Sequence, residues 1–314
     1  MRALTIAAGE LIVERRPDPV PESNEVLVKV ESAGLNAADL LQRRGLYPAP
    51  PGAPADIPGL ELAGEIVGLG AAATRWSLGD RVMAVVAGGA QAELACVDED
   101  HLLAVPTALP SIEAGAFPEA YSTAFDALVG QARLGPGERL YISGAAGGVG
   151  SAAVQLGRAL GAQVTASVRD PDRRPAVEAL GADVVIDPAA APQFGPYDVV
   201  LELVGAASLG EGLLGSLASG ARVVVIGVAG GATIELNLLG LMAARATIGG
   251  STLRARSRTE KALLASGVAT HLLPLLQKGQ IRVPLLASYS LDEASAAYTR
   301  FAQGSKLGKI VLLP

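Results

Sequence analysis

The sequence has few of the residues that build covalent or metal-based cross-links. Its 314 residues include a single cysteine, Cys96, and two histidines, His101 and His271. One cysteine cannot form an intramolecular disulfide, and a structural zinc site built from several cysteines is excluded. Because the two histidines also stand far apart in the sequence, we expect no metal at the functional site.

The sequence also lacks a long apolar run and an excess of positive charge. Its richest apolar stretch, residues 223–234, is shorter than a membrane-spanning helix and is interrupted by glycines. The formal net charge is −6, which disfavours nucleic acid or an anionic membrane as a partner. The first ten residues do not have the pattern of a secretory signal. We therefore expect a soluble cytoplasmic protein that binds neither nucleic acid nor membrane.

Half of the residues are hydrophobic, and the length suggests about two domains. Residues 1–117 show short strand-like segments between glycine- and proline-rich turns, and residues 25–30 alternate polar and apolar side chains. Residues 118–250 alternate strands with helices. Their continuous Val, Ile and Leu runs are typical of strands buried on both faces of a parallel sheet. The predicted class is therefore α/β: a β-rich region followed by a doubly wound parallel sheet, after which residues 251–314 return to the first domain.

The periodicity places individual elements along the chain. Pro274 predicts a break in the helical pattern that follows residue 258. The predicted strands are residues 25–30, 63–68, 80–86, 139–143, 163–168, 184–186, 199–203, 222–226, 285–289 and 309–313. The predicted helices are residues 37–44, 149–160, 173–180, 259–277 and 292–302.

A glycine-rich segment, residues 141–151, leaves a predicted strand and opens a predicted helix. Ala145, Gly147 and Gly150 occupy the three positions of a G-x-G-x-x-G pattern, with alanine at the first. Small residues at this spacing permit a tight turn, close approach of a diphosphate and close helix–strand packing. The helix N-terminus then offers free N–H groups to phosphate. We predict dinucleotide binding by Ala145, Gly147, Gly148, Val149 and Gly150; the alternative is a closely packed or flexible turn.

The end of the next strand bears on the choice of nucleotide. Arg169 lies 19 residues beyond Gly150, where an NAD-binding protein usually has an acidic residue for the ribose hydroxyls. Arg169 and Arg173 instead suit the 2′-phosphate of NADPH. Asp170 and Asp172 oppose this interpretation, but both fit a helix start, as a cap and as a first-turn acid. We predict NADPH as the cofactor; the alternative is that the arginines form an ordinary solvated surface.

Several segments occur together in an order typical of one family and cover nearly the whole chain. The chain resembles the medium-chain dehydrogenase/reductase superfamily, in its zinc-free quinone oxidoreductase branch. The segments that carry the resemblance are residues 34–48, 58–64, 79–82, 88–93, 118–124, 145–150 and 308–312.

The resemblance implies a GroES-like catalytic domain made of residues 1–117 and 251–314, with a Rossmann domain, residues 118–250, inserted into it. It implies a cleft between the domains where nicotinamide and substrate meet. It also implies homodimers, or tetramers built from dimers, that join Rossmann sheets at an edge formed by residues 246–251.

The resemblance further implies that no metal takes part. Zinc-dependent relatives have cysteine at the position of Asn36 and histidine at the position of Leu60, next to Glu61. The four-cysteine loop of those relatives has no counterpart in this sequence. We expect Glu61 to have a structural hydrogen-bonding role, because the metal that would accompany it is not expected.

Two residues are predicted to act at the reacting groups. Asn36 resembles a family residue near nicotinamide and substrate, and its amide suits a ribose hydroxyl or an acceptor carbonyl. Tyr47, in a glycine- and proline-rich loop, could orient or protonate a carbonyl oxygen or stack on a quinone. The alternatives are a turn-forming asparagine and a surface or packing tyrosine. By resemblance, the further cofactor contacts are Asn36 itself, Thr123, Ser167, Arg169, Arg173, Gly227, Ser251, Thr252 and Lys309.

The predicted function is NADPH-dependent, metal-independent reduction of quinones or related α,β-unsaturated carbonyl compounds. A quinone needs no dedicated acid, because its reduced oxygens can take protons from solvent. The first alternative is an enoyl- or acrylate-type reductase, which needs a positioned proton donor. The second is a protein that binds NADPH with negligible catalysis.

Overall fold

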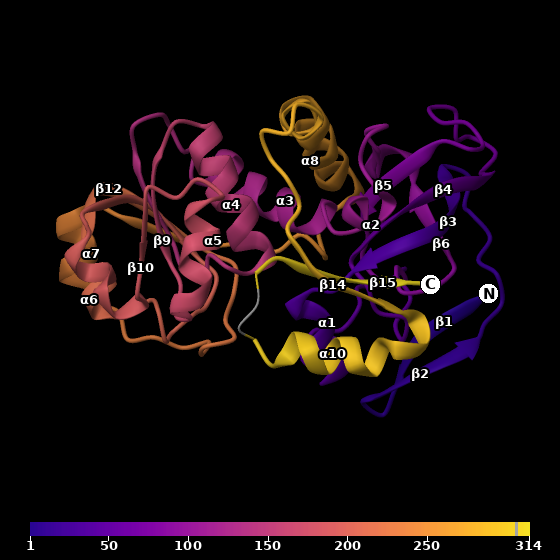
Figure 1. The fold of residues 1–314 in the computed structure, drawn as a ribbon, viewed down its shortest axis with the longest axis horizontal. Helices are drawn as coiled ribbons and strands as arrows, with labels where there is room; N and C mark the ends of the chain where they lie inside the picture. The colour runs from indigo at the N-terminus through magenta and orange to yellow at the C-terminus, as the bar shows by residue number, and fades with distance from the viewer. Residues whose placement is uncertain (305–306) are drawn as a thin grey trace. The chain divides into compact units, whose positions relative to one another are not determined.

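The computed structural model describes residues 1–304 and 307–314, which form two compact units (Figure 1). The β-rich unit comprises residues 1–122, 253–304 and 309–314. The parallel-sheet unit comprises residues 123–252, together with Leu307 and Gly308. The division falls inside helix α3 (Pro118–Phe125), which the sequence pattern did not predict.

The β-rich unit is built on a sheet with the strand order β14-β15-β3-β4-β5-β7, and β6 pairs with β3 outside this path. Val26, Val28 and Val30 alternate inward along β3, so the period-2 pattern of the sequence marks the buried face. A separate hairpin pairs β1 with β2. The strand bounds are β1 Arg2–Ala7, β2 Glu10–Arg15, β3 Glu25–Gly34, β4 Glu61–Leu69, β5 Arg81–Val85, β6 Leu94–Asp98, β7 Leu102–Ala104, β14 Leu285–Ser290 and β15 Lys309–Leu313.

The end of the chain completes this unit. β15 pairs antiparallel with β3, with Val311 opposite Gly34, and thereby carries Lys309 into the unit's interior. Helix α10 packs on β15 through Tyr298, which is buried together with Ile310. The helices of the unit are α1 Ala37–Arg43, α2 Ser111–Ala114, α8 Arg258–His271, α9 Leu273–Gln277 and α10 Ala294–Ala302, with short 3-10 turns at η1 Glu99–His101 and η5 Leu291–Glu293.

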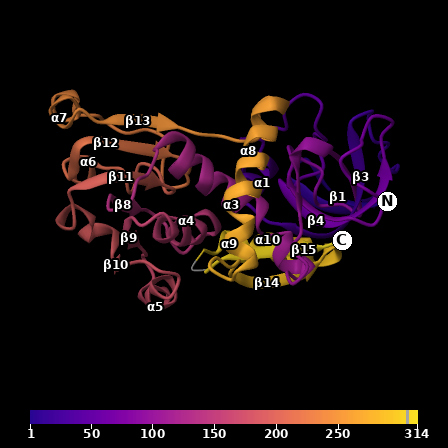
Figure 2. The same cartoon turned by 90° about the horizontal axis from the view of Figure 1, so that it is seen from above.

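The parallel-sheet unit has the order β10-β9-β8-β11-β12-β13, and every described pairing in it is parallel (Figure 2). The chain builds outward from β8 to β10, then returns to the other side of β8 and builds outward to β13. This is the doubly wound arrangement, with its switch point between β8 and β11. The bounds are β8 Arg139–Ile142, β9 Gln163–Ser167, β10 Val184–Ile186, β11 Tyr197–Glu202, β12 Leu217–Val225 and β13 Thr247–Gly250.

Short helical segments connect these strands. The apolar pattern after the glycine-rich segment forms α4, within one residue of the predicted bounds at each end. The helix predicted at residues 173–180 is shorter than expected, because a 3-10 turn with Pro171 at its start precedes it. The segments are η2 Asp126–Gln131, α4 Gly148–Ala159, η3 Pro171–Arg173, α5 Arg174–Glu178, η4 Pro188–Gln193, α6 Glu211–Leu214 and α7 Leu238–Ala244.

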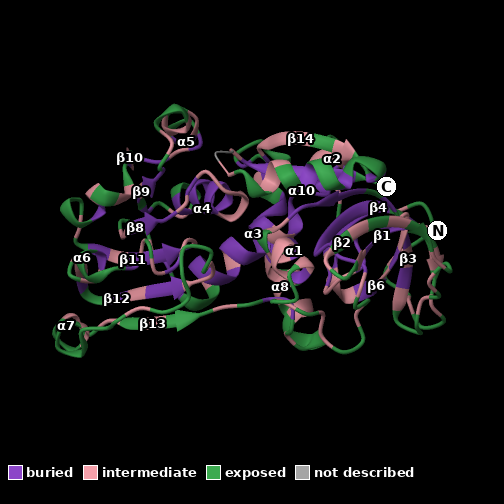
Figure 3. Ribbon diagram, turned by 90° about the horizontal axis from the view of Figure 1, so that it is seen from below, coloured by how far each residue is buried: buried purple, intermediate pink, exposed green. Residues whose placement is uncertain are grey.

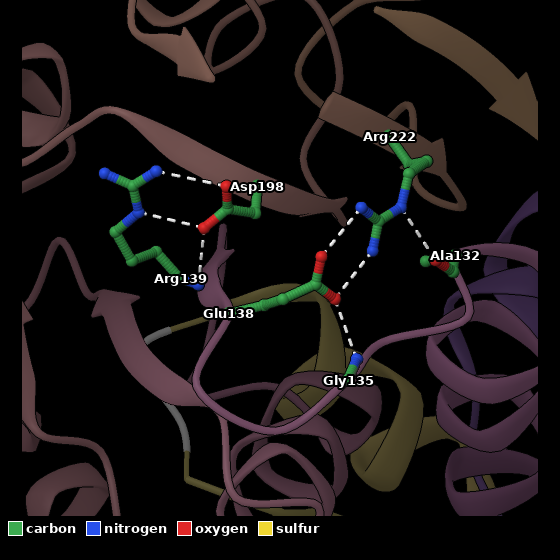
Figure 4. Close-up of polar contacts among 6 residues, drawn as sticks. All are labelled: Ala132, Gly135, Glu138, Arg139, Asp198 and Arg222. Carbon is green, nitrogen blue, oxygen red and sulfur yellow. Dashed lines mark hydrogen bonds and ion pairs between the residues drawn. The ribbon is translucent and has the colours of Figure 1, made fainter. Parts of the chain in front are cut away.

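Two ion pairs lie at the end of this sheet opposite the glycine-rich segment: one joins the neighbouring strands β8 and β11, and the other links β12 to the residue before β8 (Figure 4). Arg139, which begins β8, donates to both carboxylate oxygens of Asp198 in β11, at 2.9 and 3.1 Å. Arg222 in β12 donates to both oxygens of Glu138, at 2.9 and 2.7 Å. These hydrogen bonds lower the pKa of each carboxyl group. The pairs add side-chain links to the backbone pairing of β8, β11 and β12.

One edge of the parallel sheet is exposed and apolar. β13 is an edge strand, and both β13 and α7 are largely exposed (Figure 3). Leu238, Leu239 and Met242 of α7 have 64%, 77% and 70% of their surface exposed. Among the described residues, no helix is both long enough and apolar enough to span a bilayer. The predicted α/β class, a β-rich part with a doubly wound parallel sheet, is confirmed.

Candidate functional site

The glycine-rich segment forms the turn between β8 and α4, at the carboxyl end of the parallel sheet. A Cβ atom on Gly150 would lie 2.6 Å from both the Cα of Ala145 and the carbonyl oxygen of Gly144. Those are backbone atoms, so the close packing of helix on turn requires glycine at this position. A Cβ on Gly147 would meet only the Gly144 oxygen, at 3.4 Å, so space is open in front of this residue.

The turn leaves the beginning of α4 available to an anion. Gly147 is the N-cap residue and has no side chain to occupy the first N–H groups. The first turn of this twelve-residue helix has no acidic residue, and Gly147, Gly148 and Val149 are partly exposed. Free N–H groups and the positive end of the helix dipole together suit a diphosphate. The residues present therefore fit a dinucleotide cofactor.

A buried carboxylate shapes the neighbouring turn. One oxygen of Glu202, at the end of β11, accepts from the Ser143 hydroxyl at 2.7 Å and from the backbone N–H groups of Val204 and Gly205 at 2.6 and 2.8 Å. Glu202 is fully buried. It therefore joins the ends of β8 and β11 beside the glycine turn, a role that its sequence position did not reveal.

The basic residues after β9 are not equivalent. Arg169 is exposed and makes no hydrogen bond or ion pair within the described part of the chain, which leaves its guanidinium free for an anion. The Nε of Arg173 lies 3.6 Å from the Asp170 carboxylate, which also caps the turn as predicted by accepting from the N–H of Asp172. Ser167 lies at the end of β9, and its carbonyl accepts from Ala145 N–H at 3.1 Å. Ser167 therefore lies next to the glycine turn, and Arg169 follows it two residues along the chain.

The remaining predicted contacts of this unit lie at the ends of β12 and β13 or in α3. A Cβ on Gly227 would lie 2.0 Å from the Leu203 carbonyl oxygen, so this turn also requires glycine. Ser251 donates from its hydroxyl to Asp126, at 2.9 Å, and from its N–H to Val225. Thr123 in α3 is buried, whereas Thr252 is exposed. Because parallel strands end at one edge of a sheet, Gly227 and Ser251 share that edge with the glycine turn.

The β-rich unit holds a second group of predicted residues around a buried ammonium. Nζ of Lys309 lies 2.5 Å from Glu61 Oε1, 2.6 Å from Asn36 Oδ1 and 2.8 Å from the Leu35 carbonyl oxygen. Lys309 and Glu61 are 3% and 0% exposed. The three ammonium hydrogens thus have three acceptors inside the unit. These contacts favour a positioning role for Lys309 over the cofactor contact that the resemblance implies.

The side chain of Asn36 is fixed by this group. Its amide nitrogen donates to Glu61 Oε1 at 2.9 Å and to the Gly34 carbonyl at 3.3 Å, while its oxygen accepts from Lys309. Asn36 also caps α1, and its backbone N–H donates to Asp39 at 2.8 Å. Burial raises the pKa of Asp39 to about 6. The Asn36 oxygen accepts from Lys309 and, within the capping box, from the N–H of Asp39, so contacts inside the unit hold the whole amide group.

This group does not suit zinc. A zinc site takes thiolate, imidazole and carboxylate ligands, usually three or four of them. Of the four residues Asn36, Leu60, Glu61 and Lys309, only Glu61 offers a carboxylate. Its Oε1 already accepts from the ammonium of Lys309. Within the described residues, no cluster of three or more His, Cys, Asp or Glu side chains could hold a metal.

Tyr47 lies in the loop that follows α1 and is partly buried. Burial and the charge of Glu119 raise the pKa of its phenol, whereas the charge of Arg254 opposes them. The phenol is therefore a neutral hydrogen-bond donor at neutral pH. Arg254 itself was not predicted, because in the sequence it precedes two further arginines, 256 and 258, and resembles surface charge.

Family models match most of both units. A model described as an alcohol dehydrogenase GroES-like domain matches residues 22–107, and one described as a zinc-binding dehydrogenase matches residues 148–266. The mouse quinone oxidoreductase is 32% identical over 336 residues, which cover 100% of this chain and 98% of that protein.

Two further proteins are similar as well. The polyketide synthase GfsB of Streptomyces halstedii is 32% identical over 296 residues, which cover 93% of this chain and 5% of that much longer protein. The solved structure of mycobacterial Rv1454c complexed with NADPH superimposes with a TM-score of 0.89, at 26% identity, over the full length of both chains.

Proposed function

The chain belongs to the medium-chain dehydrogenase/reductase superfamily, in its quinone oxidoreductase branch, and from this we propose that it is an NADPH-dependent, metal-independent reductase of quinones or related α,β-unsaturated carbonyl compounds. The observation that carries the proposal is the glycine turn at the start of α4, followed after the next strand by Arg169, which is exposed and has no partner among the described residues. The NADPH bound by the structural relative Rv1454c supports the choice of nucleotide.

In this proposal, the glycine turn binds the diphosphate and the residues after β9 bind the adenosine end. Gly148 and Val149 offer N–H groups to the diphosphate, Gly147 leaves space for it, and Gly150 keeps the helix close to the turn. Arg169 binds the 2′-phosphate by charge-assisted hydrogen bonds. Ser167, before Arg169 in the sequence, and Arg173, after it, are proposed to bind the same 2′-phosphate. Ala145, Thr123, Gly227, Ser251 and Thr252 complete the predicted contacts along the nucleotide.

When bound, NADPH supplies the hydride, and the protein supplies orientation and a dry environment. Tyr47 is proposed to donate a hydrogen bond to the acceptor oxygen, because its raised pKa keeps the phenol protonated. As the family resemblance implies, Asn36 is proposed to hydrogen-bond a hydroxyl of the nicotinamide ribose or the carbonyl of the acceptor through its amide. Lys309 and Glu61 hold the Asn36 amide in that orientation.

A quinone is favoured as the acceptor because it needs the least from the protein. Both reduced oxygens can take protons from solvent, whereas an enone must receive a proton on carbon from a positioned donor. Tyr47 is the one candidate donor that the site offers among the described residues. An enoyl-type reductase is therefore the alternative, and it requires that phenol.

We further propose that the protein is a cytoplasmic homodimer that joins through the edge strand β13. An unpaired edge strand is a template for pairing with a second copy. The exposed apolar residues of α7, Leu238, Leu239 and Met242, lie next to it in the chain and suit the same interface. Sedimentation of the protein beside a Leu239→Glu variant tests this proposal, which fails if both are monomers.

The decisive experiment follows NADPH oxidation across a panel of ortho- and para-quinones and a matched panel of enones, with Tyr47→Phe as the second enzyme. We expect quinone turnover by both enzymes, slower in the variant. If enones are turned over and Tyr47→Phe abolishes only that activity, the enoyl-type alternative replaces the quinone proposal. Tight NADPH binding without turnover of either panel would show a binding protein instead.

A further inference from the structure

A buried arginine ties together three segments of the β-rich unit. Arg254 is only 3% exposed. Its Nε donates to the Ala87 carbonyl, its Nη1 to the Tyr47 carbonyl and its Nη2 to Gln42 Oε1, each at 2.7 Å. Ala87 follows β5, Gln42 belongs to α1, and Tyr47 lies in the loop after α1. A single planar guanidinium therefore sets the spacing of all three segments.

The same guanidinium contacts the ring of Tyr47. The Arg254 guanidinium carbon lies 5.2 Å from the ring centroid, within the range of a cation–π contact. Arg254 thus holds both the backbone and the side chain of the residue proposed to contact the acceptor. Gln42 also donates from its amide nitrogen to the Ala55 carbonyl at 3.1 Å, so the far end of the loop is held as well.

The loop has little else to fix it. Residues 48, 50 and 51 are prolines, which have no N–H to donate. The described backbone hydrogen bonds around this loop run from the N–H groups of Arg44 and Leu46 to the Leu41 carbonyl, from Gly45 to Gln42, and from Ala53 to Pro50. None of these hydrogen bonds involves Tyr47, so its contacts with Arg254 are the ones that hold its backbone and ring in place.

Through α1, this network reaches the other proposed catalytic residue. Asn36 caps the beginning of α1, and Gln42 lies near its end. Because a helix is rigid over two turns, the bond between Arg254 and Gln42 relates the position of Tyr47 to that of Asn36. The charge of Arg254 also lowers the pKa of the Tyr47 phenol against the effect of burial.

We propose that Arg254 is a positioning residue that sets the place of the Tyr47 phenol relative to Asn36, and thereby the efficiency with which the acceptor is reduced. The inference rests on the proposed function, because it acts through Tyr47. Lysine cannot replace Arg254, since a single ammonium lacks the planar fork that reaches three acceptors and the flat face that stacks on the ring.

A double-mutant cycle tests this inference. We expect Arg254→Lys to lower kcat/KM for a quinone by about 10- to 100-fold, the effect of a misplacement of about 1 Å. The dissociation constant for NADPH should stay within about twofold, because the glycine turn belongs to the other unit. In a Tyr47→Ala background, Arg254→Lys should cause no further loss. Arg258→Lys, the same change at an exposed arginine of α8, is the matched control and should leave kcat/KM unchanged.

An additive loss in the Tyr47→Ala background would overturn the inference, because Arg254 would then act without Tyr47. Gln42→Met, which removes one acceptor and keeps the arginine, provides a second variant if Arg254→Lys does not fold. Its smaller loss should also vanish when Tyr47 is absent.

A spectroscopic readout separates this inference from the proposed function. With 3-fluorotyrosine placed at position 47, Arg254→Lys should shift and broaden the fluorine resonance, and Arg258→Lys should not. If the protein reduces no quinone, the proposed function fails while this readout still decides the contact. An unchanged resonance would overturn the positioning role even in an active enzyme.

Discussion

Replacing Gly150 by alanine tests the glycine turn most sharply. The added Cβ would lie 2.6 Å from Ala145 Cα and from the Gly144 oxygen, whereas favourable contacts begin at about 3.5 Å. The backbone must therefore move by about 1 Å. Overpacking of this kind costs about 1–3 kcal/mol, and the better helix propensity of alanine offsets up to about 1 kcal/mol. We expect a net loss of about 1–2 kcal/mol in the free energy of unfolding.

The same movement displaces the N–H groups of Gly148 and Val149 from a bound diphosphate, so NADPH affinity should fall by about tenfold or more. Gly147→Ala is the matched control, because its Cβ meets only one atom, at 3.4 Å. It should cost less than about 1 kcal/mol of stability yet still weaken NADPH by filling the space that the diphosphate needs. Chemical denaturation and fluorescence titration measure both quantities. If Gly150→Ala changes neither stability nor affinity, the described packing is wrong.

Three further outcomes follow from buried or paired charges. Lys309→Met should lower the free energy of unfolding by about 3–5 kcal/mol, because it leaves the carboxylate of Glu61 buried and unpaired. Adding Glu61→Gln should restore most of that loss. Urea unfolding measures both variants, and a double variant less stable than Lys309→Met alone would contradict the pairing. Because Arg222 lowers the pKa of Glu138, the stability that this pair contributes at neutral pH should be lost as pH falls below about 4.5. A Glu138→Gln variant should lack that part of the acid sensitivity. If the free energy of unfolding of the variant depends on pH as it does in the unchanged protein, this prediction is refuted. The effect of pH on the contribution of Asp39 has the opposite sign. Its pKa is raised from 3.8 to about 6, so the free energy of unfolding should fall as pH rises through that range. Asp39→Asn should flatten this dependence of the free energy of unfolding on pH.

The sequence predicted the fold well where periodicity is strong. The strands at residues 184–186 and 309–313 have the predicted bounds, and the parallel sheet follows from the buried apolar runs. The elements missed are short or weakly patterned. β13 ends in two glycines and is mostly exposed, so burial imposes no periodicity on it. Helix α3 continues directly into the π-helical turn η2, an irregular geometry that no spacing rule anticipates.

The sequence predicted the part of the candidate site in which neighbouring residues of one segment supply the contacts. The glycine turn, its helix and the arginine after the next strand follow one another at fixed spacings. Contacts between distant segments were not predictable in the same way. Lys309 meets Asn36 across 273 residues, and Arg254 meets Gln42 across 212. Only the pairing of β15 with β3 and the return of the chain to the β-rich unit bring such residues together.

Above all, we expect a nucleotide with a 2′-phosphate to bind at the turn between β8 and α4. Equilibrium titration of the protein with NADPH and with NADH measures this directly, beside Arg169→Ala. We predict that NADPH binds more tightly by about 10- to 100-fold, the contribution of a charge-assisted contact, and that the variant loses most of this preference while its affinity for NADH stays the same. Equal affinities for both nucleotides, or a preference that Arg169→Ala leaves unchanged, would contradict it.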